Sequence, residues 1–81
     1  MFYVYVLKSK NKNWFYVGST KDLRERFERH LQGRVMSTKP HRPLDLVYYE
    51  AYQTYSMARK RENELKKNSQ QKEVLLKRLK S

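Results

Sequence analysis

Residues 2–18 read FYVYVLKSKNKNWFYVG and predict a β-hairpin. Residues 2–8 alternate aromatic with β-branched side chains, a pattern typical of a strand. A polar turn occupies residues 8–13, and residues 14–18 predict a second strand. Because the connection is short, we expect the two strands to pair antiparallel.

A helix is predicted after the hairpin. Ser19 and Asp22 fit a helix-start pattern, and Gly33 suits the C-terminal end of a helix. Between them, apolar residues recur one helical turn apart, which predicts a helix with one face packed on the sheet. This stripe consists of Leu23, Phe27 and Leu31.

The rest of the chain predicts one more strand and two more helices. Residues 34–43 contain both prolines and are expected to form a loop, and residues 44–52 predict a third strand. A helix over about 55–67 would bury Met57, Ala58 and Leu65, and one over about 70–79 would bury Val74, Leu75 and Leu79. The order ββαβαα predicts an α+β fold with a three-stranded antiparallel sheet. We expect one domain, residues 1–81.

The charge of the chain points to a polyanionic partner. Lys and Arg total 19 against 8 acidic residues, a formal net charge of +11. A field this positive favours nucleic acid over anionic membrane lipid. There is no cysteine, which excludes disulfides and thiolate metal sites. The apolar start is too short for a signal-peptide core or a bilayer span, so we expect a cytoplasmic protein.

Three features are candidates for chemistry, and each has a structural alternative. Arg26 and His30 fall on the edge of the stripe, where a guanidinium suits phosphate, but from the residues alone packing or solvent exposure is the more common explanation. The strand tyrosines, Tyr5 and Tyr16 among them, are either core aromatics or a general base whose pKa a nearby cation or metal lowers.

Glu62 is the sharper anomaly. With Arg61 it projects toward the apolar face of its predicted helix, where an unpaired carboxylate is costly. Two interpretations remain open. Glu62 is a ligand for a hard cation such as Mg²⁺, or it pairs with Arg61, Arg59 or another cation in a structural bridge.

At this point the residues resemble the GIY-YIG nuclease domain, and in particular its small stand-alone bacterial members. The resemblance covers nearly the whole chain and depends on the order and spacing of its parts. These parts are residues 3–7 and 15–20, residues 22–30, residues 46–50 and residues 58–62.

The resemblance implies a role for each matching residue. Tyr5 and Tyr16 match the tyrosines of the two motifs, Arg26 the catalytic arginine, His30 a histidine beside it, and Glu62 the ligand of one divalent metal ion, Mg²⁺ or Mn²⁺. It implies an endonuclease that hydrolyses DNA phosphodiester bonds, with a role in DNA repair or recombination. Lys21, Arg24 and Arg29 would then contact the nucleic acid.

The chain also departs from the family pattern. Val4-Tyr5 lacks the glycine of the first motif, and Asn68 and Asn63 are two imperfect candidates for a late asparagine. We expect no appended DNA-reading domain, and therefore little sequence preference, or a partner protein that supplies it. A basic nucleic-acid-binding module with weak or no catalysis is the alternative function.

Overall fold

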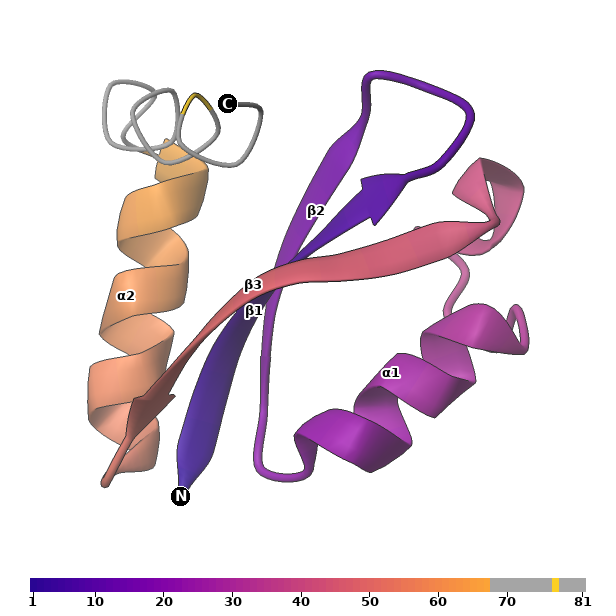
Figure 1. Cartoon of the computed structure of the whole chain (residues 1–81). Coiled ribbons are helices and arrows are strands. Elements are labelled where there is room, and N and C mark those ends of the chain that lie inside the picture. The colour runs from indigo at the N-terminus through magenta and orange to yellow at the C-terminus, as the bar shows by residue number, and fades with distance from the viewer. Residues whose placement is uncertain (68–76, 78–81) are drawn as a thin grey trace.

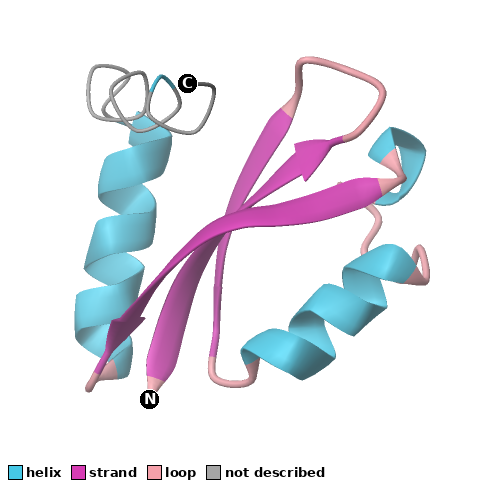
Figure 2. Cartoon of the chain, in the orientation of Figure 1, coloured by secondary structure: helices cyan, strands magenta, loops and turns pink. Residues whose placement is uncertain are grey.

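A computed structural model describes residues 1–67 and Lys77. Three strands, β1 (Phe2–Ser9), β2 (Phe15–Thr20) and β3 (Leu44–Tyr52), form an antiparallel sheet in the order β2-β1-β3. Two helices, α1 (Leu23–Leu31) and α2 (Tyr55–Lys67), flank it, and a 3₁₀ turn spans Lys39–His41 (Figures 1 and 2). The α+β class, the antiparallel hairpin and the third strand are confirmed. The helix predicted over 70–79 lies outside the described residues.

The middle strand β1 is buried on both faces, and each face has its own core. Val4 and Val6 pack with Ala58 and Leu65 of α2. Tyr5 and Leu7 point the other way, as alternation along a strand requires, and form a second cluster that Leu23 and Phe27 of α1 cover. The two helices therefore lie on opposite sides of the sheet (Figure 1).

The caps of α1 explain its bounds. The Asp22 carboxylate accepts a hydrogen bond from the Glu25 backbone N–H at 3.1 Å, so Asp22 is the N-cap. At the other end Gly33 has φ +76°, and the backbone N–H groups of Gly33 and Arg34 bond to the His30 and Arg29 carbonyls. The expected helix stop at Gly33 is confirmed. Ser19 has no part in the cap, because β2 continues past it to Thr20.

Two residues assigned to apolar faces are exposed. Leu31 is 46% exposed, because α1 turns His30 rather than Leu31 toward the sheet. Met57 is 50% exposed, while Ala58 and Leu65 carry the buried face of α2 as predicted. No described helix has the length and apolarity needed to cross a membrane.

Candidate active site

Gly18 determines where two tyrosine rings lie. Tyr5 of β1 is directly across from Gly18 of β2. A Cβ atom at Gly18 would stand 2.5 Å from the Tyr5 hydroxyl oxygen and 2.9 Å from Cε2 of Tyr16. These distances are far below van der Waals contact, so only glycine leaves room for the rings. The second motif thus needs its glycine for packing around the Tyr5 hydroxyl.

His30 lies against both tyrosines. Its ring centroid is 5.6 Å from that of Tyr5 and 5.3 Å from that of Tyr16, and the two tyrosine centroids are 6.3 Å apart. The residue is 0% exposed, so the expectation that it sits at the rim of the helix is corrected: it belongs to the core. Residues from β1, β2 and α1 therefore meet on one side of the sheet.

A chain of hydrogen bonds fixes the protonation of His30. The Thr38 hydroxyl donates to the Val35 carbonyl at 3.3 Å. The Thr38 hydroxyl oxygen then accepts a hydrogen bond from His30 Nδ1 at 2.7 Å. This leaves His30 Nε2 as the acceptor for the Tyr5 hydroxyl at 2.9 Å. Burial, together with the charge of Arg26, lowers the pKa of His30 to about 4. The imidazole is neutral at pH 7, with its lone pair directed at the Tyr5 proton.

Arg26 adds a permanent cation to this group. Its half-buried guanidinium interacts with the Tyr5 hydroxyl, and less strongly with Tyr16, which raises the pKa of Arg26. Burial raises the pKa of Tyr5 to about 12, although Arg26 opposes the shift. At neutral pH the cluster holds a phenol, a neutral imidazole and a guanidinium.

Glu62 approaches from the opposite face of the sheet. It is only 5% exposed, and Ser19 of β2 donates to its Oε1 at 2.5 Å. Arg59 contacts Oε1 at 3.3 Å and Lys66 contacts Oε2 at 2.7 Å. Burial alone would raise the pKa of Glu62, but the bonds from Lys66 and Ser19 outweigh it and lower the pKa.

Lys66 links Glu62 to the tyrosine side. Its Nζ lies 5.9 Å from the centroid of the Tyr16 ring while it holds the Glu62 carboxylate. Tyr16 and the Glu62 partner Ser19 both belong to β2, whose outer edge has no strand partner within residues 1–67. Four of the five predicted residues thus gather on the α1 side, and Glu62 reaches the same edge from the α2 side. The negative charge of Glu62 contributes to the raised pKa of Tyr5.

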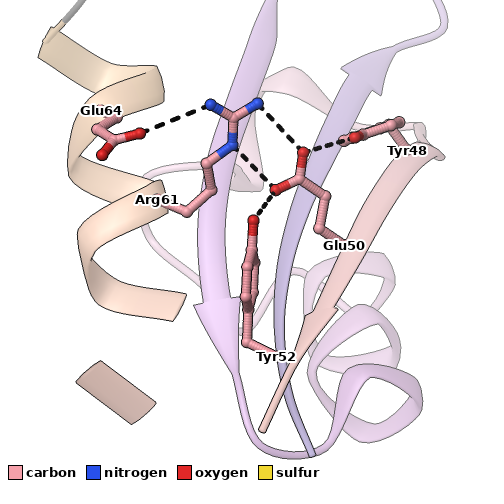
Figure 3. Close-up of polar contacts among 5 residues, drawn as sticks. All are labelled: Tyr48, Glu50, Tyr52, Arg61 and Glu64. Carbon is pink, nitrogen blue, oxygen red and sulfur yellow. Dashed lines mark hydrogen bonds and ion pairs between the residues drawn. The ribbon is translucent and has the colours of Figure 1, made fainter. Parts of the chain in front are cut away.

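A second carboxylate fastens α2 to the sheet (Figure 3). Glu50 of β3 accepts from Arg61 at 2.9 and 3.2 Å, and from Tyr48 and Tyr52 at 2.5 Å each. Arg61 also contacts Glu64 at 3.7 Å. Burial would raise the pKa of Glu50, but these bonds lower it. Arg61 is therefore engaged by Glu50. Of the candidate partners of Glu62, Arg59 forms the ion pair, together with Lys66.

The three basic residues assigned to nucleic-acid contact are exposed on or just before α1. Arg29 forms a surface ion pair with Glu25 at 2.6 Å. Lys21 and Arg24 line an open groove beside Tyr3. Asn63, the weaker candidate for the late asparagine, is exposed on α2, and Asn68 lies outside the described residues.

No sequence pattern indicated several contacts of the site. Thr38 and Ser19 are common polar residues whose partners are distant in the chain, so no spacing rule identifies them. His41 stacks on Trp14, with centroids 3.7 Å apart and planes within 5°, and Trp14 stacks in turn with Tyr16 at 6.2 Å. This aromatic row extends the tyrosine side away from His30.

Comparison with known proteins identifies the family. The family model of the GIY-YIG catalytic domain matches residues 1–74. UPF0213 proteins of Staphylococcus aureus strains Mu50 and N315 are 41% identical over 75 residues, covering 91% of this chain and 90% of each relative. The solution NMR structure of a UPF0213 protein from Bacillus halodurans has a TM-score of 0.54 and 30% identity, covering 95% of this chain and 86% of that chain. The chain therefore belongs to the GIY-YIG catalytic domain family.

Proposed function

We propose that the chain is a metal-dependent endonuclease that hydrolyses DNA phosphodiester bonds with little sequence preference. Membership of the family supports a nuclease-type function. The observation that carries the proposal is the buried group in which Tyr5 donates to His30 beside Arg26. A non-specific DNA endonuclease suits DNA repair or recombination in the cytoplasm. We take residues 1–81 as one domain with this function.

Arg26 binds the scissile phosphate in the proposal. Its guanidinium carries charge at all working pH values, and its planar fork matches two phosphate oxygens. Negative charge that grows on these oxygens in the transition state is stabilised by a cation already in place. A bound phosphate also offsets the electrostatic effect of Arg26 on His30, which after burial is the smaller of the two causes that lower the pKa of His30.

Tyr5 and His30 move the proton of the attacking water. The Tyr5 oxygen accepts a proton from water while its own proton passes along the 2.9 Å bond to His30 Nε2. The water oxygen forms the bond to phosphorus, and the bond to the leaving oxygen breaks with its electron pair on that oxygen, which takes a proton from solvent. His30 then returns its proton to Tyr5, which releases one to solvent. Tyr16, packed against both rings, holds the two in register.

Glu62 is the proposed metal ligand, and its surroundings limit the kind of site. Its carboxylate oxygens suit Mg²⁺ or Mn²⁺, but both already have cationic or hydroxyl partners. The described residues contain no cluster of three or more His, Cys, Asp or Glu side chains. One carboxylate fits a cation that takes its other ligands from water and substrate, with Lys66 displaced. Such an ion supplies Lewis-acid stabilisation of the phosphate.

A nucleic-acid-binding module without catalysis is the second candidate. The two ion pairs of Glu62 with Arg59 and Lys66 favour it, because they neutralise the carboxylate without any metal. The net charge of +11 suits either function.

Plasmid nicking with purified protein separates the two. The proposal expects nicking with Mg²⁺ or Mn²⁺ and none in chelator. Glu62→Gln should reduce the rate on the order of 10²-fold or more while DNA affinity is kept. Glu64→Gln is the matched control, an acidic residue on the same helix whose contact is with Arg61. If the folded wild-type protein nicks no plasmid with either metal ion, the endonuclease is refuted and the binding module is favoured.

A further inference from the structure

An open groove of about 870 Å³ adjoins the candidate active site on the α1 side. We call it the α1 groove. Its walls are Tyr3, Leu46 and Tyr49 from the sheet and Leu23 and Phe27 from α1. Tyr3 is two residues from Tyr5 along β1, and Phe27 follows Arg26 directly. Residues of the groove are therefore neighbours of Tyr5 and Arg26, the residue proposed to bind the scissile phosphate.

Tyr49 is the distinctive residue of this groove. It is directly across from Tyr5 in the pairing of β1 with β3, on the same face of the sheet. Tyr5 packs over Gly18 of β2, on the other side of β1, and Tyr49 is 55% exposed. Its ring meets Tyr3 edge-to-face, with centroids 6.1 Å apart. A large exposed aromatic held in place by another ring is a ready stacking surface for a planar base.

The rim of the α1 groove suits a phosphate backbone. Lys21 and Arg24 line it, and neither has an ion-pair partner in the described part of the chain. The two acids beside them are already engaged. Asp22 caps the backbone N–H of Glu25, and Glu25 pairs with Arg29. The rim thus presents unpaired positive charge next to aromatic walls.

We propose that the α1 groove binds an unpaired nucleotide next to the cut, with its base on Tyr49 and its phosphate held by Lys21 and Arg24. The position next to the cut rests on the proposed function, which puts the scissile phosphate at Arg26. Bases in a duplex are stacked on each other, so only an unpaired one offers its face to a side chain. The substrates this implies are DNA molecules with a single-stranded segment at the cleavage point.

The test is fluorescence anisotropy with a labelled single strand and the matching blunt duplex, in chelator and at fixed ionic strength. Tyr49→Leu should weaken single-strand binding about 5- to 150-fold, the range that base–aromatic stacking supplies. Duplex binding should change less than about twofold. Tyr49→Phe keeps the ring and should bind like the parent.

Tyr55 provides a matched control on the other side of the sheet. It is 59% exposed and meets Phe2 edge-to-face at 5.9 Å, much as Tyr49 meets Tyr3. Tyr55→Leu should leave binding of both DNA forms unchanged. Two results for Tyr49→Leu with an unchanged melting curve overturn the groove assignment: an equal loss of affinity for single strand and duplex, or no loss of affinity for either. If Tyr49→Leu weakens single-strand binding selectively but the protein cleaves no DNA with any metal ion, the nucleotide-binding groove is supported and the proposed endonuclease is refuted.

Discussion

Replacing Thr38 with valine tests whether the hydrogen-bond chain behind Tyr5 matters. Valine has nearly the same shape, but it removes the oxygen that accepts from His30 Nδ1 at 2.7 Å. Thr38 and His30 are both 0% exposed, so water cannot replace the lost partner. A buried donor left unpaired costs about 1–3 kcal/mol, which converts to a bias of about 5- to 150-fold between the two tautomers.

We expect the Thr38→Val protein to shift His30 toward the form protonated at Nε2. That form has no lone pair for the Tyr5 proton, so nicking should fall about 10-fold or more. The ¹⁵N chemical shifts of the two ring nitrogens report the tautomer without any substrate. Thr38→Ser keeps the hydroxyl and should restore both tautomer and rate. A folded Thr38→Val protein with the parent tautomer and parent rate would refute this reasoning.

Three further perturbations follow from the same contacts. Gly18→Ala puts a methyl group 2.5 Å from the Tyr5 oxygen. It should lower the free energy of unfolding by about 1–3 kcal/mol and break the hydrogen bond between Tyr5 and His30. An unchanged melting temperature and unchanged activity would contradict this. Burial lowers the pKa of His30 to about 4, so as pH falls below 6.5 the unfolded chain binds a proton before the folded protein does. Urea unfolding should therefore show the free energy of unfolding falling by about 2–4 kcal/mol between pH 6.5 and 4. His30→Gln should show little of this loss. Glu50→Gln weakens the contacts that hold α2 and should lower the free energy of unfolding by about 1–3 kcal/mol. Glu25→Gln, at an exposed ion pair, should lower it by less than about 1 kcal/mol. Equal losses in the two variants would argue against the network.

The elements of the fold were predictable because local patterns determine them. Alternation in residues 2–8 and 44–52 predicted both strands, and helical spacing predicted α2 as it is observed. Rotation of the helices about their axes was less predictable. Spacing alone treated Leu31 and Met57 as buried, but a short helix has few packing contacts, and the position of His30 set the rotation of α1.

The grouping of four candidate residues was predictable from the sequence, but their contacts were not. The family resemblance brought together Tyr5, Tyr16, Arg26 and His30, which the structure places in one group. It did not indicate that Glu62 approaches from the other face, because sequence order does not encode which side of a sheet a helix covers. Likewise Arg61 and Arg59 were both candidate partners of Glu62 along the helix, and only Arg59 pairs with it, because Glu50 on β3 holds Arg61.

The most direct test of the central claim is the nicking rate of Tyr5→Phe with Mg²⁺ or Mn²⁺. The change removes one oxygen atom and keeps the ring that packs over Gly18, so folding should be retained. DNA affinity should also be retained, because Arg26 and the surface cations are untouched. The account predicts a loss of about 10²- to 10⁴-fold in rate, the range for a positioned proton-transfer group. A folded Tyr5→Phe protein that nicks DNA as fast as the parent would contradict it.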